Sequence, residues 1–303
     1  MPPARGFRVP GTVRVPPGCA HVKTQHRSPA TATLDARFRT RTRAAEAGAE
    51  VETTMTRTAE MSDALQGAVD RGEMVPWFQP QYDLRTYRLV GAEVLCRWDH
   101  PEWGLVRPND FIPLAEEIGI IDEIGQCMTE YALTAIGEWN IDISVNVSPV
   151  QLESGDFTSW LEQSLARLRY PAKRLTVEIT EGRDLGDVPP LVARLDRLRN
   201  HGVGIAIDDF GAGHASLAQA RRLHATELKI DRHLTGDDSP ETTAQIAKAV
   251  AFARDAELRT VAEGVETTAQ LHRVRQLGCT RGQGYLWSRP VPRDEMARMI
   301  ATA

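Results

Sequence analysis

The sequence predicts an α/β protein, a TIM-like (β/α)8 barrel whose first strand runs antiparallel to the others. Three observations predict this fold. Eight β-rich runs alternate with amphipathic helical stretches over about 240 residues, which is the size of such a barrel. The polar residues of most runs fall on one face of the strand. Finally, the first connection between strands is too short to contain a helix.

The elements follow one another in chain order, and the strand candidates are 76–79, 91–98, 143–148, 175–180, 203–208, 227–231, 259–263 and 281–285. Helical patterns lie between most of them. In one, Leu191, Leu195 and Leu198 share a single face, as in a helix that packs on a core. Helical crossovers imply parallel strands. Residues 80–90 are fewer than the dozen or so that a crossover needs, so we expect strand one to be antiparallel.

The composition is that of an ordinary globular protein. The 303 residues carry a formal net charge of −5, and 42% of them are hydrophobic. The cysteines form no CxxC pair, which argues against zinc sites and disulfides and favours a reducing compartment. There is no apolar run of roughly 18 residues and no basic stripe. We therefore expect a cytoplasmic protein that binds neither a membrane nor a nucleic-acid polymer.

Composition changes near residue 60. Residues 1–60 are rich in Arg, Thr, Ala and Pro and have almost no large aliphatic side chains. Such a segment cannot bury enough surface to offset the entropy lost on ordering. We expect 1–60 to be a disordered extension and 61–303 to be one compact domain.

Alternation along the strands predicts the contents of the barrel. In 175–180, Leu175, Val177 and Ile179 face one way and Glu178 faces the other. The face covered by helices must be apolar, so the polar partners should point inward. The inward set is Glu93, Asn146, Glu178, Asp208 and Lys229. Most of these lie near the C-terminal ends of strands, where barrel enzymes keep their active sites.

Converging carboxylates repel one another unless a cation lies between them. Oxygen ligands without His or Cys indicate Mg2+ or Mn2+, with Ca2+ as an alternative. Asp209 can reach a second ion about 4 Å from the first, as in two-metal phosphoryl sites. Lys229 could orient a phosphate or water, and Glu263 is a candidate general base. Taken singly, these residues have ordinary structural interpretations; Lys229 alone could simply neutralise Asp231.

At these residues the sequence resembles the EAL-domain family of cyclic di-GMP phosphodiesterases. The resemblance covers about residues 62–300. Its motifs are, in order, WFQPQYDL, GAEVLCRWDHPEWGLVRPNDFIPLAEE, NVSPVQL, VEITE, DDFGAGHASL, LKIDR, AEGVE and GQGYLWSRP. It implies a barrel with an antiparallel first strand and hydrolysis of cyclic di-GMP to linear pGpG. Two ions of Mg2+ or Mn2+ would be needed, and Ca2+ would inhibit.

The resemblance also implies a role for each site residue. By motif position, the metal ligands are Glu93, Asn146, Glu178 and Asp208, with Asp209 serving the second metal. The other implied roles are water contact for Lys229, catalytic base for Glu263, loop anchoring for Glu181, further site positions for Glu266 and Gln283, and substrate contact for Gln79 and Arg97. Helices flanking the site loop could support a homodimer.

Two motifs depart from the family pattern. Val94 replaces Ala in Glu-Ala-Leu, but it should face away from the site. Ala212, His214 and Ala215 replace the usual Thr, Tyr and Ser of the loop. Ala212 lacks a hydroxyl that could tie this loop to Glu181. Weaker metal affinity or lower turnover is the resulting hypothesis, and unchanged kinetic constants in Ala212→Thr would reject it.

Two functions of different classes remain. The first is a metal-dependent phosphodiesterase. The alternative is a degenerate EAL domain that binds cyclic di-GMP or a protein partner without hydrolysis. Degenerate members usually lose one or more of the acids, and this sequence keeps the full set, which favours catalysis. Another metal-dependent barrel enzyme would fit the chemistry but not the motif order.

Overall fold

The computed structural model describes residues 57–168, 170–179, 188–211 and 217–303. The chain divides into two units, Met1–Arg57 and Thr58–Ala303. The second unit carries the fold described below.

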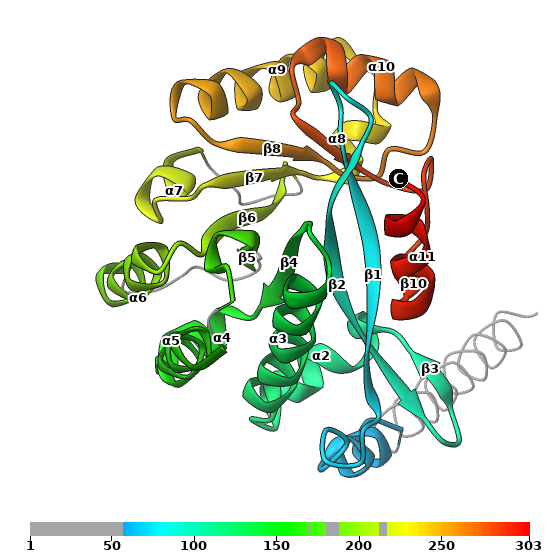
Figure 1. The fold of residues 1–303 in the computed structure, drawn as a ribbon, viewed down its shortest axis with the longest axis vertical. Coiled ribbons are helices and arrows are strands. Elements are labelled where there is room, and N and C mark those ends of the chain that lie inside the picture. The colour runs from blue at the N-terminus through cyan, green and yellow to red at the C-terminus, as the bar shows by residue number, and fades with distance from the viewer. Residues whose placement is uncertain (1–56, 169, 180–187, 212–216) are drawn as a thin grey trace, which may run out of the picture. The chain divides into compact units, whose positions relative to one another are not determined.

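Eight strands close into a barrel, which confirms the predicted fold class (Figure 1). Around the barrel they are ordered β1, β9, β8, β7, β6, β5, β4 and β2, and β2 pairs again with β1. Their bounds are β1 (Met74–Asp83), β2 (Leu89–His100), β4 (Asp142–Val147), β5 (Leu175–Ile179), β6 (Gly204–Phe210), β7 (Glu227–Ile230), β8 (Arg259–Ala262) and β9 (Arg281–Gln283).

Strand β1 is antiparallel to both of its barrel neighbours, β2 and β9. The other barrel neighbours pair in parallel. The prediction from the short first connection is therefore confirmed. In Figure 1, β1 and β2 are the two longest strands of the sheet and run side by side as a hairpin. Both strands are longer than predicted. At the end of the hairpin near Met74 and Trp98, the last residues of β2 pair with a third strand outside the barrel.

Two short strands were missed by the sequence prediction, which counted eight. Strand β3 (Gly104–Val106) pairs with the end of β2, and β10 (Val291–Pro292) pairs with β1. Both are antiparallel additions outside the closed barrel. Runs of two or three residues next to Pro or Gly are too short to show a period-2 pattern, which is why they escaped detection.

Helices surround the barrel and bury its outer face. They are α2 (Pro108–Glu117), α3 (Ile121–Glu138), α4 (Pro149–Ser154), α5 (Asp156–Leu168), α6 (Val188–Asn200), α7 (Leu217–Arg222), α8 (Arg232–Gly236), α9 (Pro240–Asp255), α10 (Thr268–Leu277) and α11 (Arg293–Ala301). The predicted face of α6 with Leu191, Leu195 and Leu198 is buried. Each such leucine contributes roughly 1.5–3 kcal/mol through burial.

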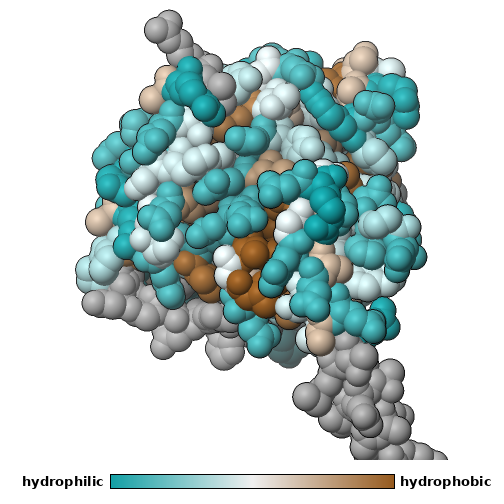
Figure 2. Space-filling view, turned by 90° about the horizontal axis from the view of Figure 1, so that it is seen from below, coloured by the Kyte–Doolittle hydropathy of each residue, from teal (hydrophilic) through white to brown (hydrophobic). Residues whose placement is uncertain are grey.

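Apolar side chains fill the space between helices and strands. Val145, Val177 and Ile205 are each at most 1% exposed, so the outward parity of these strands is as predicted. The face in Figure 2 is mainly hydrophilic, with apolar side chains gathered near its middle. Within the described ranges, no helix is both long and apolar enough to cross a membrane.

Candidate active site

Four carboxylates from different parts of the chain meet at one end of the barrel. Glu93 lies on β2, Glu178 on β5 and Asp208 on β6, while Glu263 directly follows β8. The strand register adds an amide to this group. Asn146 of β4 pairs with Glu178 of β5 in the parallel register, so the two side chains lie side by side on the same face of the sheet. The inward parity predicted from the sequence therefore holds.

The Lys229 ammonium lies at the centre of these carboxylates. Its Nζ atom is 2.5 Å from Glu178 Oε2, 2.8 Å from Glu263 Oε1, 3.0 Å from Asp208 Oδ1 and 3.6 Å from Glu93 Oε2. Lys229 is only 1% exposed. A buried charge of this kind is tolerated only when it is paired. The four acids neutralise the charge of Lys229, and Lys229 is the positive charge that they share.

The structural alternative for Lys229, pairing with Asp231, is wrong. The Asp231 carboxylate instead caps α8, where its Oδ1 accepts a hydrogen bond from the His233 amide at 2.8 Å. Lys229 is therefore part of the carboxylate cluster and has no structural duty at the helix cap.

Burial and the close charges shift the pKa values of the residues in this cluster, and the shifts differ from one residue to the next. Burial would lower the pKa of Lys229, but the surrounding carboxylates raise it well above its ordinary value. Burial raises the pKa of Glu178, and the negative charges of Glu93 and Asp208 raise it further against the effect of Lys229. Burial also raises the pKa of Glu263, to about 8. The site thus holds a permanent ammonium and at least two carboxyls that readily take up protons.

Glu93 is the carboxyl of the cluster whose pKa is lowered, and two amide side chains donate hydrogen bonds to it. Burial raises its pKa, but the Lys229 charge and hydrogen bonds outweigh burial and the net shift is downward. Asn146 Nδ2 donates to Glu93 Oε1 at 2.6 Å, and Gln283 Nε2 donates to Glu93 Oε2 at 2.6 Å. Glu93 is therefore the carboxylate most firmly kept in its charged form.

Gln283 belongs to a chain of three amides. Its Nε2 also donates to Gln79 Oε1 at 3.1 Å, and its Oε1 accepts from Gln81 Nε2 at 3.0 Å. Gln81 was missed by the sequence reasoning, although it shares the inward face of β1 with Gln79 at a spacing of two. The network fixes the Gln283 amide and, through it, Glu93.

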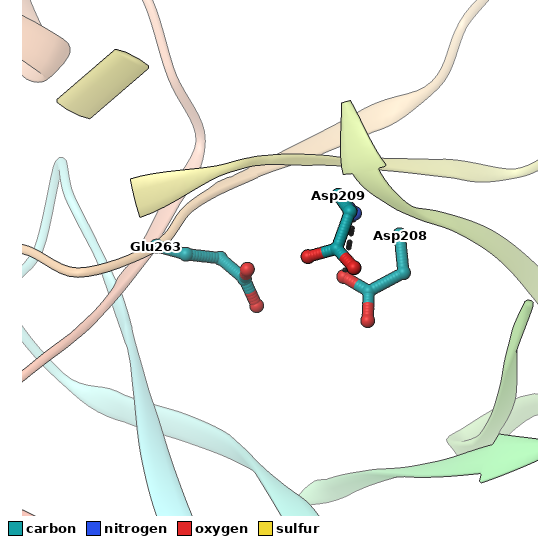
Figure 3. Close-up of side chains that lie close together, drawn as sticks. All are labelled: Asp208, Asp209 and Glu263. Atoms are coloured by element: carbon teal, nitrogen blue, oxygen red, sulfur yellow. Dashed lines mark hydrogen bonds between the residues drawn. The ribbon is translucent and has the colours of Figure 1, made fainter. Parts of the chain in front are cut away.

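A bulge explains how two adjacent aspartates serve the same site. In a regular strand Asp208 and Asp209 would point to opposite faces. The register of β6 with β7 shifts between Ile207 and Phe210, and Asp209 has φ +56°. Its amide donates to Asp208 Oδ1 at 2.9 Å. A bulge re-aims side chains in this way, and Figure 3 shows both carboxylates on the side that faces Glu263.

Asp208, Asp209 and Glu263 form a second group of oxygens. One ligand atom from each lies within 4.8 Å of the others. Burial raises the pKa of Asp209 to about 6, assisted by the charges of Asp208 and Asp231. Repulsion between these carboxylates is the feature that a bound cation would relieve.

The residues fit hard divalent cations. Glu178 is completely buried, yet its Oε1 has no hydrogen-bond partner. A buried, unpartnered carboxylate oxygen is costly unless it has a ligand. The donors are carboxylate and amide oxygens, which suit Mg2+ or Mn2+. Glu93, Asn146, Glu178 and Asp208 could hold one ion, and Asp208, Asp209 and Glu263 could hold another.

The other residues that the sequence predicted for the site lie outside the carboxylate cluster around Lys229 or outside the described residues. Arg97 is half-buried on β2, two positions beyond Leu95 on the face that carries Glu93. Glu266 is exposed in the loop after β8, where its amide donates to Gln270. Val94 is buried in the core, on the opposite face of β2. The predicted loop anchor Glu181 lies outside the described residues, as do Ala212, His214 and Ala215.

The family model of the EAL domain matches residues 62–290, which is most of the chain. The chain therefore belongs to the EAL domain family. It is 35% identical over 245 residues to the bifunctional diguanylate cyclase/cyclic di-GMP phosphodiesterase MucR of Pseudomonas aeruginosa, covering 78% of this chain and 36% of MucR. The cyclic di-GMP phosphodiesterase PA2567 of the same organism is 32% identical, with 72% of this chain and 38% of that protein covered.

Solved structures agree with the family assignment. The PaMucR phosphodiesterase in complex with c-di-GMP matches with a TM-score of 0.73 at 35% identity, covering 78% of this chain and 99% of that one. The EAL domain protein of Listeria monocytogenes matches with a TM-score of 0.72 at 26% identity, covering 80% and 98%. This chain spans about a third of the length of the first curated relatives it matches.

Proposed function

We propose that this chain is a metal-dependent phosphodiesterase that hydrolyses cyclic di-GMP to linear pGpG. One observation carries the proposal: Glu93, Glu178, Asp208 and Glu263 all lie within 3.6 Å of the Lys229 ammonium. An EAL domain that has lost catalysis would be expected to lack one or more of these acids, and this chain keeps all of them. The substrate is proposed from the similarity to MucR and PA2567, whose names give this activity.

Each side chain of the site has a part in the proposed reaction. Two divalent cations, Mg2+ or Mn2+, would supply an activated water and neutralise charge on the phosphate and the leaving oxygen. Glu263 takes a proton from the attacking water, because its carboxylate lies beside the oxygens of Asp208 and Asp209 that could hold a cation. Lys229 stays charged and orients the water and the phosphate. Asn146 and Gln283 keep Glu93 fixed.

Incubation of the purified chain with cyclic di-GMP and Mg2+ or Mn2+, followed by chromatography, tests the proposal. We expect pGpG with either cation, and none with chelator or with Ca2+ alone. Glu93→Ala should abolish the product, because it removes a carboxylate that could hold a cation. Nucleotide binding without any product would reject hydrolysis and favour the receptor function. Neither binding nor product would leave a protein-interaction role.

A further inference from the structure

Three buried glutamines lie next to Glu93 because of the strand register. Strand β1 lies between β2 and β9. On one side it pairs Gln79 with Glu93, and on the other it pairs Gln81 with Gln283. None of these four residues is more than 9% exposed. The oxygen of an amide side chain only accepts hydrogen bonds and its nitrogen only donates them, so a buried row of amides must be oriented consistently.

Two groups that can only accept hydrogen bonds determine the direction of this row. Gln283 Nε2 donates to Glu93 Oε2 at 2.6 Å, and Gln79 Nε2 donates to the Ser288 carbonyl oxygen at 3.3 Å. Gln79 Oε1 is thereby left to accept from Gln283 Nε2, at 3.1 Å. If the Gln283 amide were turned over, its oxygen would face two acceptors, the Glu93 carboxylate and the Gln79 oxygen.

Gln81 supplies the donor that this orientation of Gln283 requires. With its nitrogen turned to Glu93, Gln283 has a buried oxygen, which accepts a hydrogen bond from Gln81 Nε2 at 3.0 Å. A buried amide oxygen without a donor is costly. Without Gln81, the Gln283 amide would have to turn toward another donor, and this movement would withdraw its nitrogen from Glu93.

Gly91 leaves room for the other end of the Gln81 amide. It is the residue of β2 opposite Gln81. A Cβ atom at this position would lie 3.2 Å from Gln81 Oε1, 3.4 Å from Arg281 Nη1 and 3.0 Å from the Asp142 carbonyl oxygen. The Gln81 oxygen and the Arg281 guanidinium group therefore both lie close to a position that has no side chain. The positive charge of Arg281 favours an oxygen there, which leaves the Gln81 nitrogen for Gln283.

We propose that Gln81 is a positioning residue for Glu93: it holds Gln283 in the orientation that gives Glu93 a hydrogen bond, and so sets the affinity of the site for a divalent cation. This inference rests on the proposed function, in which Glu93 could hold a cation. Asn146 Nδ2 donates to the other Glu93 oxygen at 2.6 Å, so each oxygen receives an amide hydrogen bond. Loss of partners that orient a metal ligand typically lowers metal affinity by about 10–100-fold.

Gln81→Glu tests this role, because it keeps the shape of the side chain and replaces the donor by an acceptor. Arg281 lies next to this position and favours the charged form of the new carboxylate. A negative charge that acted directly on a bound cation would strengthen its binding. The proposed role predicts the opposite, since Gln283 would turn its nitrogen to the new carboxylate and its oxygen to Glu93. We expect Mn2+ to bind about 10–100-fold more weakly.

A double-mutant cycle shows whether Gln81 acts through Gln283. Gln81→Met removes the donor without adding a charge, and it should weaken Mn2+ binding less than Gln81→Glu does. In the Gln283→Met background, neither change at residue 81 should weaken Mn2+ binding further. Gln163→Glu makes the matched change at an exposed residue of α5 and should leave Mn2+ binding as in wild type. Electron paramagnetic resonance of free Mn2+, without nucleotide, gives the affinities.

Turnover provides a second readout. Hydrolysis of cyclic di-GMP by Gln81→Glu should be reduced at low Mn2+ and return toward the wild-type kcat as Mn2+ saturates, which a loss of folded protein would not allow. If the wild type does not hydrolyse but Gln81→Glu binds Mn2+ more weakly, the inference stands while the proposed activity fails.

Equal or tighter Mn2+ binding in Gln81→Glu, or the same loss in the Gln283→Met background, would overturn the inference. If Gln81→Glu does not fold, Gln81→Met in the two backgrounds decides in the same way. A wild type that binds no Mn2+ would overturn both proposals.

Discussion

Lys229→Met is expected to destabilise the metal-free protein by about 3–5 kcal/mol near pH 8.5, the usual cost of removing one partner from a buried ion pair. Methionine preserves most of the volume but leaves Glu93, Glu178, Asp208 and Glu263 without their shared counter-charge. Whole domains have a free energy of unfolding of about 5–15 kcal/mol. This single change should therefore remove a large fraction of the stability.

The pH dependence identifies the cause. The pKa values of Glu178 and Glu263 are raised in the folded protein, so the folded state holds more protons than the unfolded state above about pH 4.5. Stability then falls as pH rises through the folded pKa, which is about 8 for Glu263. Without Lys229 both pKa values rise further, so the difference from wild type should grow between pH 5 and pH 8.5.

Urea unfolding in the presence of EDTA at these two pH values measures the effect. Lys248→Met, which changes an exposed lysine of α9, is the control and should shift stability little at either pH. A loss in Lys229→Met that is the same at pH 5 and pH 8.5 would mean that packing, rather than charge, explains it. A loss as small as in the control would contradict the central position of Lys229.

Glu263→Gln is expected to lower kcat by about 10²–10⁴-fold, the usual contribution of general acid–base catalysis, with a much smaller change in KM. Glutamine keeps the shape and an acceptor for Lys229 but cannot take a proton from water. Because the pKa of Glu263 is about 8, the wild-type carboxyl is largely neutral at pH 6 in the metal-free protein. At pH 6 the unfolded wild type has already released this proton, so folding must take it up again, whereas the variant has no such cost and should be at least as stable as wild type.

At higher pH the two proteins should diverge in stability. Up to about pH 8 the folded wild type holds a proton on Glu263 that the unfolded chain has released, whereas the variant has no group that titrates there. We expect Glu263→Gln to lose less free energy of unfolding between pH 6 and pH 8.5. Glu130→Gln, an exposed acid of α3, should leave both kcat and this pH dependence unchanged. A Glu263→Gln protein with wild-type kcat would remove Glu263 from the role of base.

The fold and the inward set of residues were accessible from the sequence because the barrel strands are regular. Where Leu, Val and Ile alternate with polar residues, a period of two fixes the direction of Glu178 without any knowledge of its neighbours. The short connection after β1 likewise leaves no geometric choice but an antiparallel strand. These are local rules, and the structure follows them.

The rest depends on contacts that no local rule contains. The hydrogen bond from Gln283 to Glu93 joins residues 190 positions apart. The bulge that turns Asp208 and Asp209 to the same side comes from the pairing of β6 with β7. Lys229 reaches four acids at once because the closed barrel brings their strands around it. Sequence patterns indicated which side chains point inward, and the closed sheet determines which of them meet.

The central claim is that these carboxylates form a site for two divalent cations, and counting bound Mn2+ tests it most directly. Titration of the metal-free chain, with free Mn2+ followed by electron paramagnetic resonance, should give two ions per wild-type chain. Asp209→Asn should reduce the number to one, because Asp209 belongs only to the second group of oxygens. No bound Mn2+ in the wild type, or the same number in the variant, would contradict the account.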